Sequence, residues 1–151
     1  MEIRCSTKIS KSLYSRSLND KKVRYLVIGG YAVAFHSYPR YTKDMDIWIE
    51  MSAENADRIL AALVEFGFGS LEITSEDFLT SNQVIQLGYP PNRIDLITTP
   101  DGVDFSTCYD AKNEVEISGI TVPFIDLANL KINKLASGRL QDLADLENLS
   151  G

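Results

Sequence analysis

Three aspartates in short apolar segments are the residues best suited to chemistry in this chain. Asp44 and Asp46 stand one residue apart in KDMDIWIE, and Asp95 is flanked by apolar residues in RIDLITT. Residues two apart in a β-strand point to the same face, so Asp44 and Asp46 share one face if this segment is a strand. If the strand carrying Asp95 lies beside it, three carboxylates converge there.

Such a cluster needs a counter-charge. Two like charges 4 Å apart repel by about 4 kcal/mol at an effective dielectric constant of 20, so the acids either take up protons or bind cations. Carboxylate oxygens suit Mg²⁺ or Mn²⁺, and acids on a rigid strand suit two-metal phosphoryl transfer. Taken singly, each acid has a structural alternative: a loop-end cap for Asp44, and a solvated strand position for Asp46 or Asp95.

A glycine pair precedes the acids. Gly29-Gly30 ends the apolar run YLVI and opens a short helical segment. Glycines there let backbone N–H groups approach a phosphate, which the helix N-terminus also attracts. The alternative is a tight turn that needs a positive φ.

Periodicity predicts an α/β (α+β) fold, with a mixed β-sheet and helices packed on it. A single domain is expected over residues 23–151, after a solvated helical lead-in at 1–22. Ser52 and Asp126 are expected helix N-caps, and Gly138 is expected to end a helix. The predicted strands are 23–28, 44–50, 71–74, 83–87, 93–98, 115–117 and 120–124, and the predicted helices are 8–20, 31–36, 53–66, 127–137 and 140–149.

Together these motifs resemble the nucleotidyltransferase superfamily, the fold of DNA polymerase beta. Its signature is an apolar residue and a glycine pair, then Asp-x-Asp, then a third acid on a later strand; here these are IGG, DMDI and IDL. More narrowly, GGYAVAFHSYPRYTKDMDI looks like small bacterial AbiEii-like toxins and antibiotic nucleotidyltransferases. The C-terminal LANLKINKLASGRLQDLADLENL also fits that pattern of a Lys, an Arg and spaced Asp residues.

The resemblance implies transfer of a nucleoside monophosphate from an NTP such as ATP to a hydroxyl, with release of pyrophosphate. The acceptor would be RNA or tRNA, a protein or a small molecule. Gly29 and Gly30 would cradle the β- and γ-phosphates. Asp44 and Asp46 would ligate two Mg²⁺ or Mn²⁺ ions. Asp95 would ligate one ion and act as the base for the acceptor hydroxyl.

Cations are expected near the triphosphate, and the candidates are Arg40, Lys43 and Lys134. Arg40 can make a bidentate phosphate contact from the loop before the acids, and Thr42 can add a hydrogen bond. Solvated side chains are the alternative for the three cations, and bonding to its own loop is the alternative for Thr42.

The C-terminal helices carry further expectations. Leu135 is predicted on the buried side of its helix, opposite Lys134. Arg139 and Asp142, three apart, are predicted to form an ion pair. The leucine stripe at 140, 143, 146 and 149 suits core packing or a partner helix. Trp48 shares the carboxylate face, where it either packs or stacks on a base.

Composition excludes several function classes. A net charge of −6 argues against a general nucleic-acid coat, which depends on many Lys and Arg contacts to phosphate. With His36 as the one histidine, His/Cys zinc sites and a histidine-rich metal phosphohydrolase are disfavoured. Two cysteines make no disulfide framework, and the N-terminus lacks the apolar centre of a secretory signal, so a cytoplasmic protein without a membrane anchor is expected.

A second function class remains open. The small size of the chain fits a non-catalytic nucleotide-binding or partner-binding module, such as one half of a toxin–antitoxin pair with a cognate antitoxin-like partner.

Overall fold

The computed structural model describes residues 8–37, 44–67, 72–88 and 93–150. Within these ranges the chain forms one six-stranded sheet in the order β3-β4-β2-β1-β6-β5. The strands are β1 (Tyr25–Ile28), β2 (Met45–Ile49), β3 (Val84–Leu87), β4 (Ile94–Ile97), β5 (Asn113–Ile117) and β6 (Ile120–Phe124). The helices are α1 (Lys8–Asp20), α2 (Gly29–His36), α3 (Ala53–Glu65), the 3₁₀ helix η1 (Ser75–Phe78), α4 (Phe105–Asp110), α5 (Leu127–Ser137) and α6 (Leu140–Ser150).

The sheet is mixed, as predicted. The central strand β1 runs antiparallel to β2 and parallel to β6, while β2 runs parallel to β4. Both predicted hairpins are present as antiparallel pairs, β3 with β4 and β5 with β6. Ser118 and Gly119, between β5 and β6, have φ of 53° and 79°, as a two-residue turn that matches strand twist requires.

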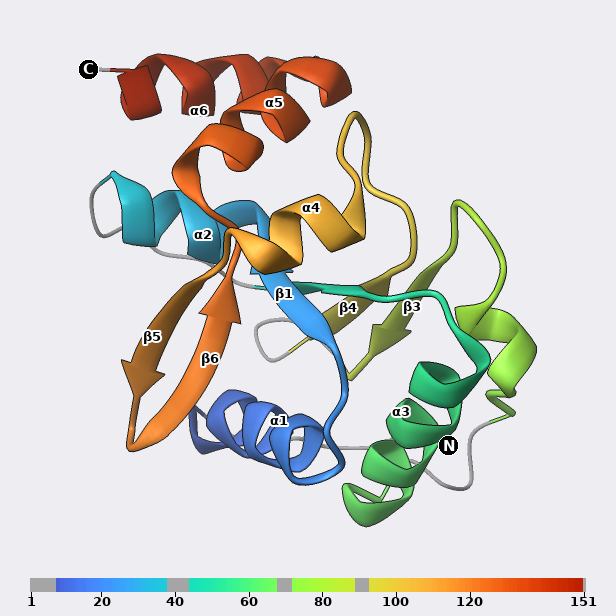
Figure 1. Ribbon diagram of the computed structural model, residues 1–151. Helices are drawn as coiled ribbons and strands as arrows, with labels where there is room; N and C mark the ends of the chain where they lie inside the picture. The colour runs from blue at the N-terminus through green and yellow to red at the C-terminus, as the bar shows by residue number, and fades with distance from the viewer. Residues whose placement is uncertain (1–7, 38–43, 68–71, 89–92, 151) are drawn as a thin grey trace.

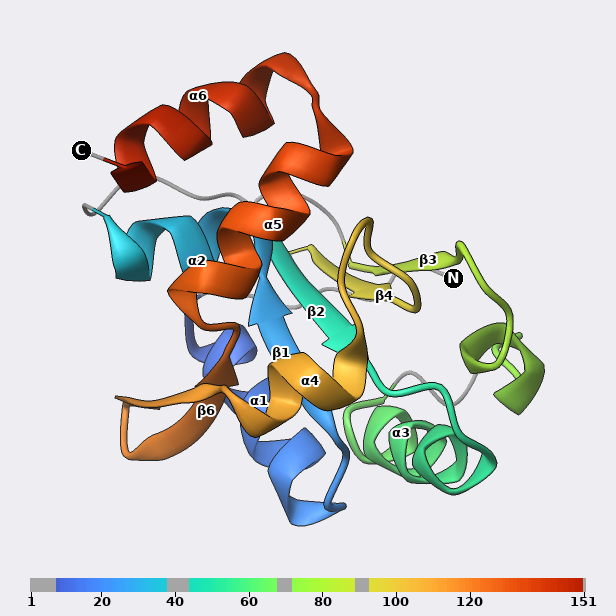
Figure 2. The same cartoon turned by 45° about the horizontal axis from the view of Figure 1, so that its top comes forward.

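Helices cover both sides of the sheet (Figure 1). Helices α1 and α3 lie together on one side, and α2, α4, α5 and α6 lie on the other, an arrangement that the turned view repeats (Figure 2). Met45, Ile47 and Ile49 of β2 are buried, which confirms the predicted apolar face. Since side chains alternate along a strand, the same alternation sends Asp46 and Trp48 to the opposite side.

The N-terminal helix is confirmed, but it is not solvated along its length. Tyr14 is 3% exposed and stacks on Phe66 at the end of α3, with ring centroids 4.3 Å apart. Leu18 is buried in the same core, and the Ser17 hydroxyl donates a hydrogen bond of 2.8 Å to Glu65. Helix α1 is therefore part of the packed structure.

The predicted helix ends are confirmed. The Ser52 hydroxyl accepts a hydrogen bond from the Asn55 N–H at 3.2 Å and so caps α3. The Asp126 carboxylate accepts one from the Asn129 N–H at 3.3 Å at the start of α5. Gly138 follows α5 with a φ of 65°, the left-handed conformation that a helix-ending glycine adopts.

Two local expectations need correction, and one helix was not predicted. Residues 72–74 of the predicted strand 71–74 form no strand, and Leu71 lies outside the described residues. The chain instead enters η1 through a capping box between Thr74 and Asp77. Helix α4 was not predicted, because its six residues are too few to show a helical period. Leu135 is 67% exposed rather than buried.

No helix in the described ranges is both long enough and apolar enough to cross a membrane.

Candidate functional site

The acidic face is formed by two neighbouring strands. Asp46 of β2 lies directly opposite Asp95 of β4 in the parallel pair, so the two side chains share one face. On its other side, Asp46 pairs with Ile28, the last residue of β1. The adjacency of these strands, on which convergence of the carboxylates depended, is therefore confirmed.

An arginine that the sequence analysis did not select joins two of the acids. The Arg93 Nη2 lies 3.0 Å from Asp44 Oδ2, and its Nε lies 3.0 Å from Asp95 Oδ1. Nη2 also donates a hydrogen bond of 3.2 Å to Asp95 Oδ2. Arg93 stands two residues before Asp95, so the alternation that placed Asp44 with Asp46 also places Arg93 with Asp95. That signal was available in the sequence.

The site has more carboxylates than cations, and the pKa values of two of its aspartates are raised. Burial, reinforced by the neighbouring Asp95 carboxylate, raises the pKa of Asp46 to about 6, although Lys134 acts in the opposite direction. Burial also raises the pKa of Asp95, against the opposing effect of Arg93. Both carboxyl groups are therefore more basic than exposed aspartates.

Gly29 is required by its surroundings. It has a φ of 68°, and a Cβ added there would lie 2.2 Å from Asp46 Oδ2. Glycine thus allows both the turn out of β1 and the close approach of the Asp46 carboxylate. Helix α2 begins at this point, and its N-cap residue, Ile28, provides no side-chain hydrogen bond. The first-turn N–H groups of α2 are therefore left without a side-chain cap, as at an anion-binding helix start.

A cleft of about 530 Å³ opens beside these groups. Gly29, Gly30 and Asp46 line one side, and residues of α5, α6 and the segment between them line the other. Figure 2 shows α5 and α6 above the start of α2. The volume falls within the range of roughly 300–1,000 Å³ that small-molecule sites occupy, so the cleft is large enough for a nucleotide.

Lys134 lies in this cleft but already has partners. Its ammonium group is buried and lies 3.1 Å from both Asp142 and Asp145 of α6. The predicted Arg139–Asp142 ion pair is confirmed, with Nε 2.8 Å from Oδ2. Burial favours a higher pKa for Asp142, but hydrogen bonds from Arg139 and Lys134 outweigh it and hold the pKa below its usual value. Arg139 remains largely exposed at the cleft.

The other predicted contacts divide into two groups. Arg40, Thr42 and Lys43 lie outside the described residues. Trp48 packs rather than presenting a stacking surface: it is 2% exposed, meets Phe105 edge to face at 5.2 Å, and donates from Nε1 to the Thr98 carbonyl at 3.2 Å. The indole belongs to the core beneath α4.

The acids have suitable chemistry for a hard divalent cation, but they are not gathered around one point. In the described part of the chain, no group of three or more Asp, Glu, His or Cys side chains is arranged to hold a metal ion. Nevertheless, Asp44 Oδ1 is buried and accepts no hydrogen bond from a described residue, while Asp95 Oδ1 faces Arg93 Nε at 3.0 Å. Carboxylate oxygens are donors that suit Mg²⁺ and Mn²⁺, and Asp44 Oδ1 is the one that lacks a partner among the described residues. The donor set therefore fits, while Arg93 holds two of the acids.

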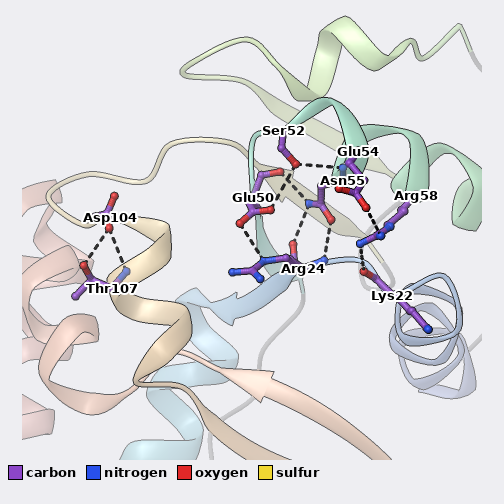
Figure 3. A network of polar contacts seen from close by, with 9 residues as sticks. All are labelled: Lys22, Arg24, Glu50, Ser52, Glu54, Asn55, Arg58, Asp104 and Thr107. Atoms are coloured by element: carbon purple, nitrogen blue, oxygen red, sulfur yellow. Dashed lines mark hydrogen bonds and ion pairs between the residues drawn. The ribbon is translucent and has the colours of Figure 1, made fainter.

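The opposite end of the sheet carries a different polar network (Figure 3). Asn55 accepts a hydrogen bond from the Arg24 N–H at 2.8 Å and donates to the carbonyls of Arg24 and Glu50 at 3.1 and 2.8 Å. The Arg24 Nε lies 2.9 Å from Glu50. Arg58 pairs with Glu54 and donates to the Lys22 carbonyl. Here positive and negative groups are matched.

Comparison with known proteins identifies the fold. No protein-family model matches the chain, and no curated protein does. A Thermotoga maritima structure that bears the name putative nucleotidyltransferase aligns with a TM-score of 0.61 at 20% identity, over 93% of this chain and 89% of that one. An antigenic nucleotidyltransferase-like protein from Paracoccidioides brasiliensis aligns with a TM-score of 0.56 at 18% identity, over 92% and 71%. The chain has the nucleotidyltransferase fold; the narrower likeness to AbiEii-like toxins stays a prediction.

Proposed function

We propose that this protein is a metal-dependent nucleotidyltransferase that moves a nucleoside monophosphate from an NTP to a hydroxyl acceptor. The observation that supports this most is the meeting of two features at one cleft. Asp46, paired in register with Asp95, lies against Gly29 at the uncapped start of α2. Carboxylates for metal ions and amides for phosphate are thus within reach of one nucleotide.

Different groups of the chain bind the phosphates and accept the proton. The N–H groups of Gly29 and Gly30 bind the β- and γ-phosphates at the start of α2. The acceptor oxygen bonds to the α-phosphorus as the bond from that phosphorus to pyrophosphate breaks. Asp95 takes the hydroxyl proton as the general base. When bound by Asp44, Asp46 and Asp95, two Mg²⁺ or Mn²⁺ ions supply charge neutralisation and activation of the hydroxyl.

Cations of the cleft complete the nucleotide site. Lys134 acts on the nucleotide through its charge from a buried position between Asp142 and Asp145, because leaving them would take an ammonium group from two buried carboxylates, of which Asp142 alone also pairs with Arg139. Arg139 is paired through Nε, and no described residue accepts a hydrogen bond from its terminal nitrogens, so these can meet a phosphate. Arg40, Thr42 and Lys43 are proposed to add phosphate contacts from the segment before β2.

A transfer assay tests the proposal. The protein is incubated with labelled NTPs, Mg²⁺ or Mn²⁺, and pools of RNA, protein and aminoglycosides, and the label in each pool is measured. Asp46→Asn is expected to abolish the labelling. Glu50→Gln, at the far end of the same sheet, is expected to leave it unchanged and serves as the matched control. If no pool is labelled and no NTP binds in the presence of metal, the proposed function is wrong.

One observation favours the alternative of a non-catalytic nucleotide-binding module of a toxin–antitoxin pair. Arg93 pairs with two of the three acids, and the described residues contain no preformed metal group. This alternative predicts that NTP binds without transfer, and that Asp46→Asn still acts in cells together with a small protein that co-purifies.

A further inference from the structure

Arg93 lies where a cation would be needed. It contacts both Asp44 and Asp95 at 3.0 Å, and these are two of the three acids of the metal site that the proposed function assumes. We propose that Arg93 is the internal counter-ion of this site, and that a divalent cation binds only by displacing its guanidinium group from the two carboxylates. This inference rests on the proposed metal site, and it assigns Arg93 a positioning role rather than a catalytic one.

The geometry is that of a clamp on Asp95. Nε and Nη2 of one guanidinium face Oδ1 and Oδ2 of Asp95 at 3.0 and 3.2 Å. Such paired contacts fix the orientation of a carboxylate as well as neutralising it. The same Nη2 reaches Asp44 Oδ2, so one nitrogen joins the two acids. The side chains of Arg93, Asp44 and Asp95 are at most 27% exposed, which limits screening by water.

A metal ion and Arg93 compete for the same oxygens. An ion bound by Asp95 needs the lone pairs that now face Nε and Nη2, and its charge repels the guanidinium, which also contacts Asp44 Oδ2. Asp46 has no such ion pair among the described residues, and its carboxylate lies against Gly29 instead. Metal entry therefore requires Asp44 and Asp95 to exchange one cation for another and to turn toward Asp46.

The exchange has two consequences. Without metal, Arg93 offsets part of the repulsion among three carboxylates and so stabilises the fold. With metal, the free energy of breaking two ion pairs is subtracted from the binding free energy. The wild-type site should therefore bind a free cation more weakly than its three carboxylates alone would allow.

Titration of Mn²⁺ alone, followed by loss of the free-ion signal in electron paramagnetic resonance, tests the inference on the full chain. Arg93→Gln is expected to bind Mn²⁺ on the order of tenfold more tightly than the wild type, within the usual range for coupled ligands. Arg24→Gln removes the corresponding arginine, paired with Glu50 at 2.9 Å at the other end of the sheet, and is expected to change the Mn²⁺ affinity less than about twofold.

If Arg93→Gln does not fold, a second variant and a second measurement still test the inference. Arg93→Lys keeps the charge, but an ammonium group cannot make the paired contact, so it is expected to bind Mn²⁺ with intermediate affinity. In thermal unfolding, Mn²⁺ is expected to raise the Tm of either variant more than that of the wild type.

Equal or weaker Mn²⁺ binding in the variant that folds would overturn the inference while leaving the proposed function intact. If neither the wild type nor a folded Arg93 variant binds Mn²⁺, the metal site and the inference both fail. If Arg93→Gln binds Mn²⁺ more tightly but the wild type transfers no nucleotide, the inference stands and the proposed function fails.

Discussion

The two ends of the sheet manage charge in opposite ways. At the end shown in Figure 3, Arg24 pairs with Glu50, and buried Asn55 makes three hydrogen bonds to backbone groups. At the other end, one guanidinium pairs with two of the three carboxylates, and the pKa of Asp46 is raised to about 6 by burial and by the charge of Asp95.

This difference separates stability from binding. Polar groups that are matched within the chain gain little from a ligand, because their partners are already present. Carboxylates held in excess destabilise the folded chain until a proton or cation arrives, which is the usual cost of a binding site. The end with Arg24 and Asn55 therefore serves stability, and the end with the three acids serves function. Substitutions at the first end should lower the free energy of unfolding, whereas removal of a carboxylate charge at the second should raise it.

The largest effect is expected from Asn55→Ala. This substitution breaks three hydrogen bonds to backbone groups of Arg24 and Glu50, so we expect the free energy of unfolding to fall by about 3 kcal/mol at roughly 1 kcal/mol per bond. Urea denaturation measures this. Mn²⁺ affinity should stay unchanged, and an altered affinity would show that the two ends are coupled.

Asp46→Asn should raise the free energy of unfolding rather than lower it. The carboxyl group in the folded chain keeps its proton up to about pH 6, whereas in the unfolded chain it loses that proton near 3.8, the ordinary pKa of an aspartate. The stability that this protonation gives is full below about pH 4 and lost as the pH rises through 6.

Asparagine does not ionise, so the free energy of unfolding of Asp46→Asn should exceed that of the wild type by about 2–3 kcal/mol at pH 8 without metal. At pH 4 the two should differ little. Paired urea denaturations at the two pH values measure the difference. A variant that is less stable than the wild type at pH 8 would contradict the assignment of Asp46 to an electrostatically unfavourable site.

The smallest effect compares two glycines. Gly29→Ala should cost about 2 kcal/mol, from a positive φ and from displacement of the Asp46 carboxylate. Gly119, in the turn between β5 and β6, also has a positive φ but no atom near its missing Cβ, so Gly119→Ala should cost only about 1 kcal/mol. Thermal unfolding of both variants measures the difference, and equal costs would contradict a close contact at Asp46.

Much of the fold was predictable because its signals are local. Alternation identified the buried face of β2, and the side chains of Ser52 and Asp126 marked helix starts within three residues of their partners. Helix α4 escaped prediction because six residues do not establish a period. Its Asp104 cap, which accepts hydrogen bonds from Thr107, is visible only once the helix is known (Figure 3).

The C-terminal helices show where local periodicity misleads. Leu140 and Leu143, two members of the predicted stripe, are 88% and 45% exposed, while Asp142 and Asp145 face inward. The partner decides this orientation: Lys134 is buried on α5, and a buried ammonium group requires carboxylates beside it. The sequence of α6 alone therefore does not predict which of its faces is buried.

The sequence by itself determined which residues share a face along one segment: Asp44 with Asp46, and Arg93 with Asp95. It also indicated a turn at Gly29-Gly30 after β1, with a positive φ as one of two interpretations. Only the tertiary structure decided that β4 lies beside β2, that Arg93 reaches Asp44 as well as Asp95, and that α5 and α6 complete the cleft. The physical reason is the sequence separation over which each property is set. Side-chain direction follows from the backbone dihedrals of neighbouring residues, whereas strand adjacency and ion pairing depend on how the whole chain packs.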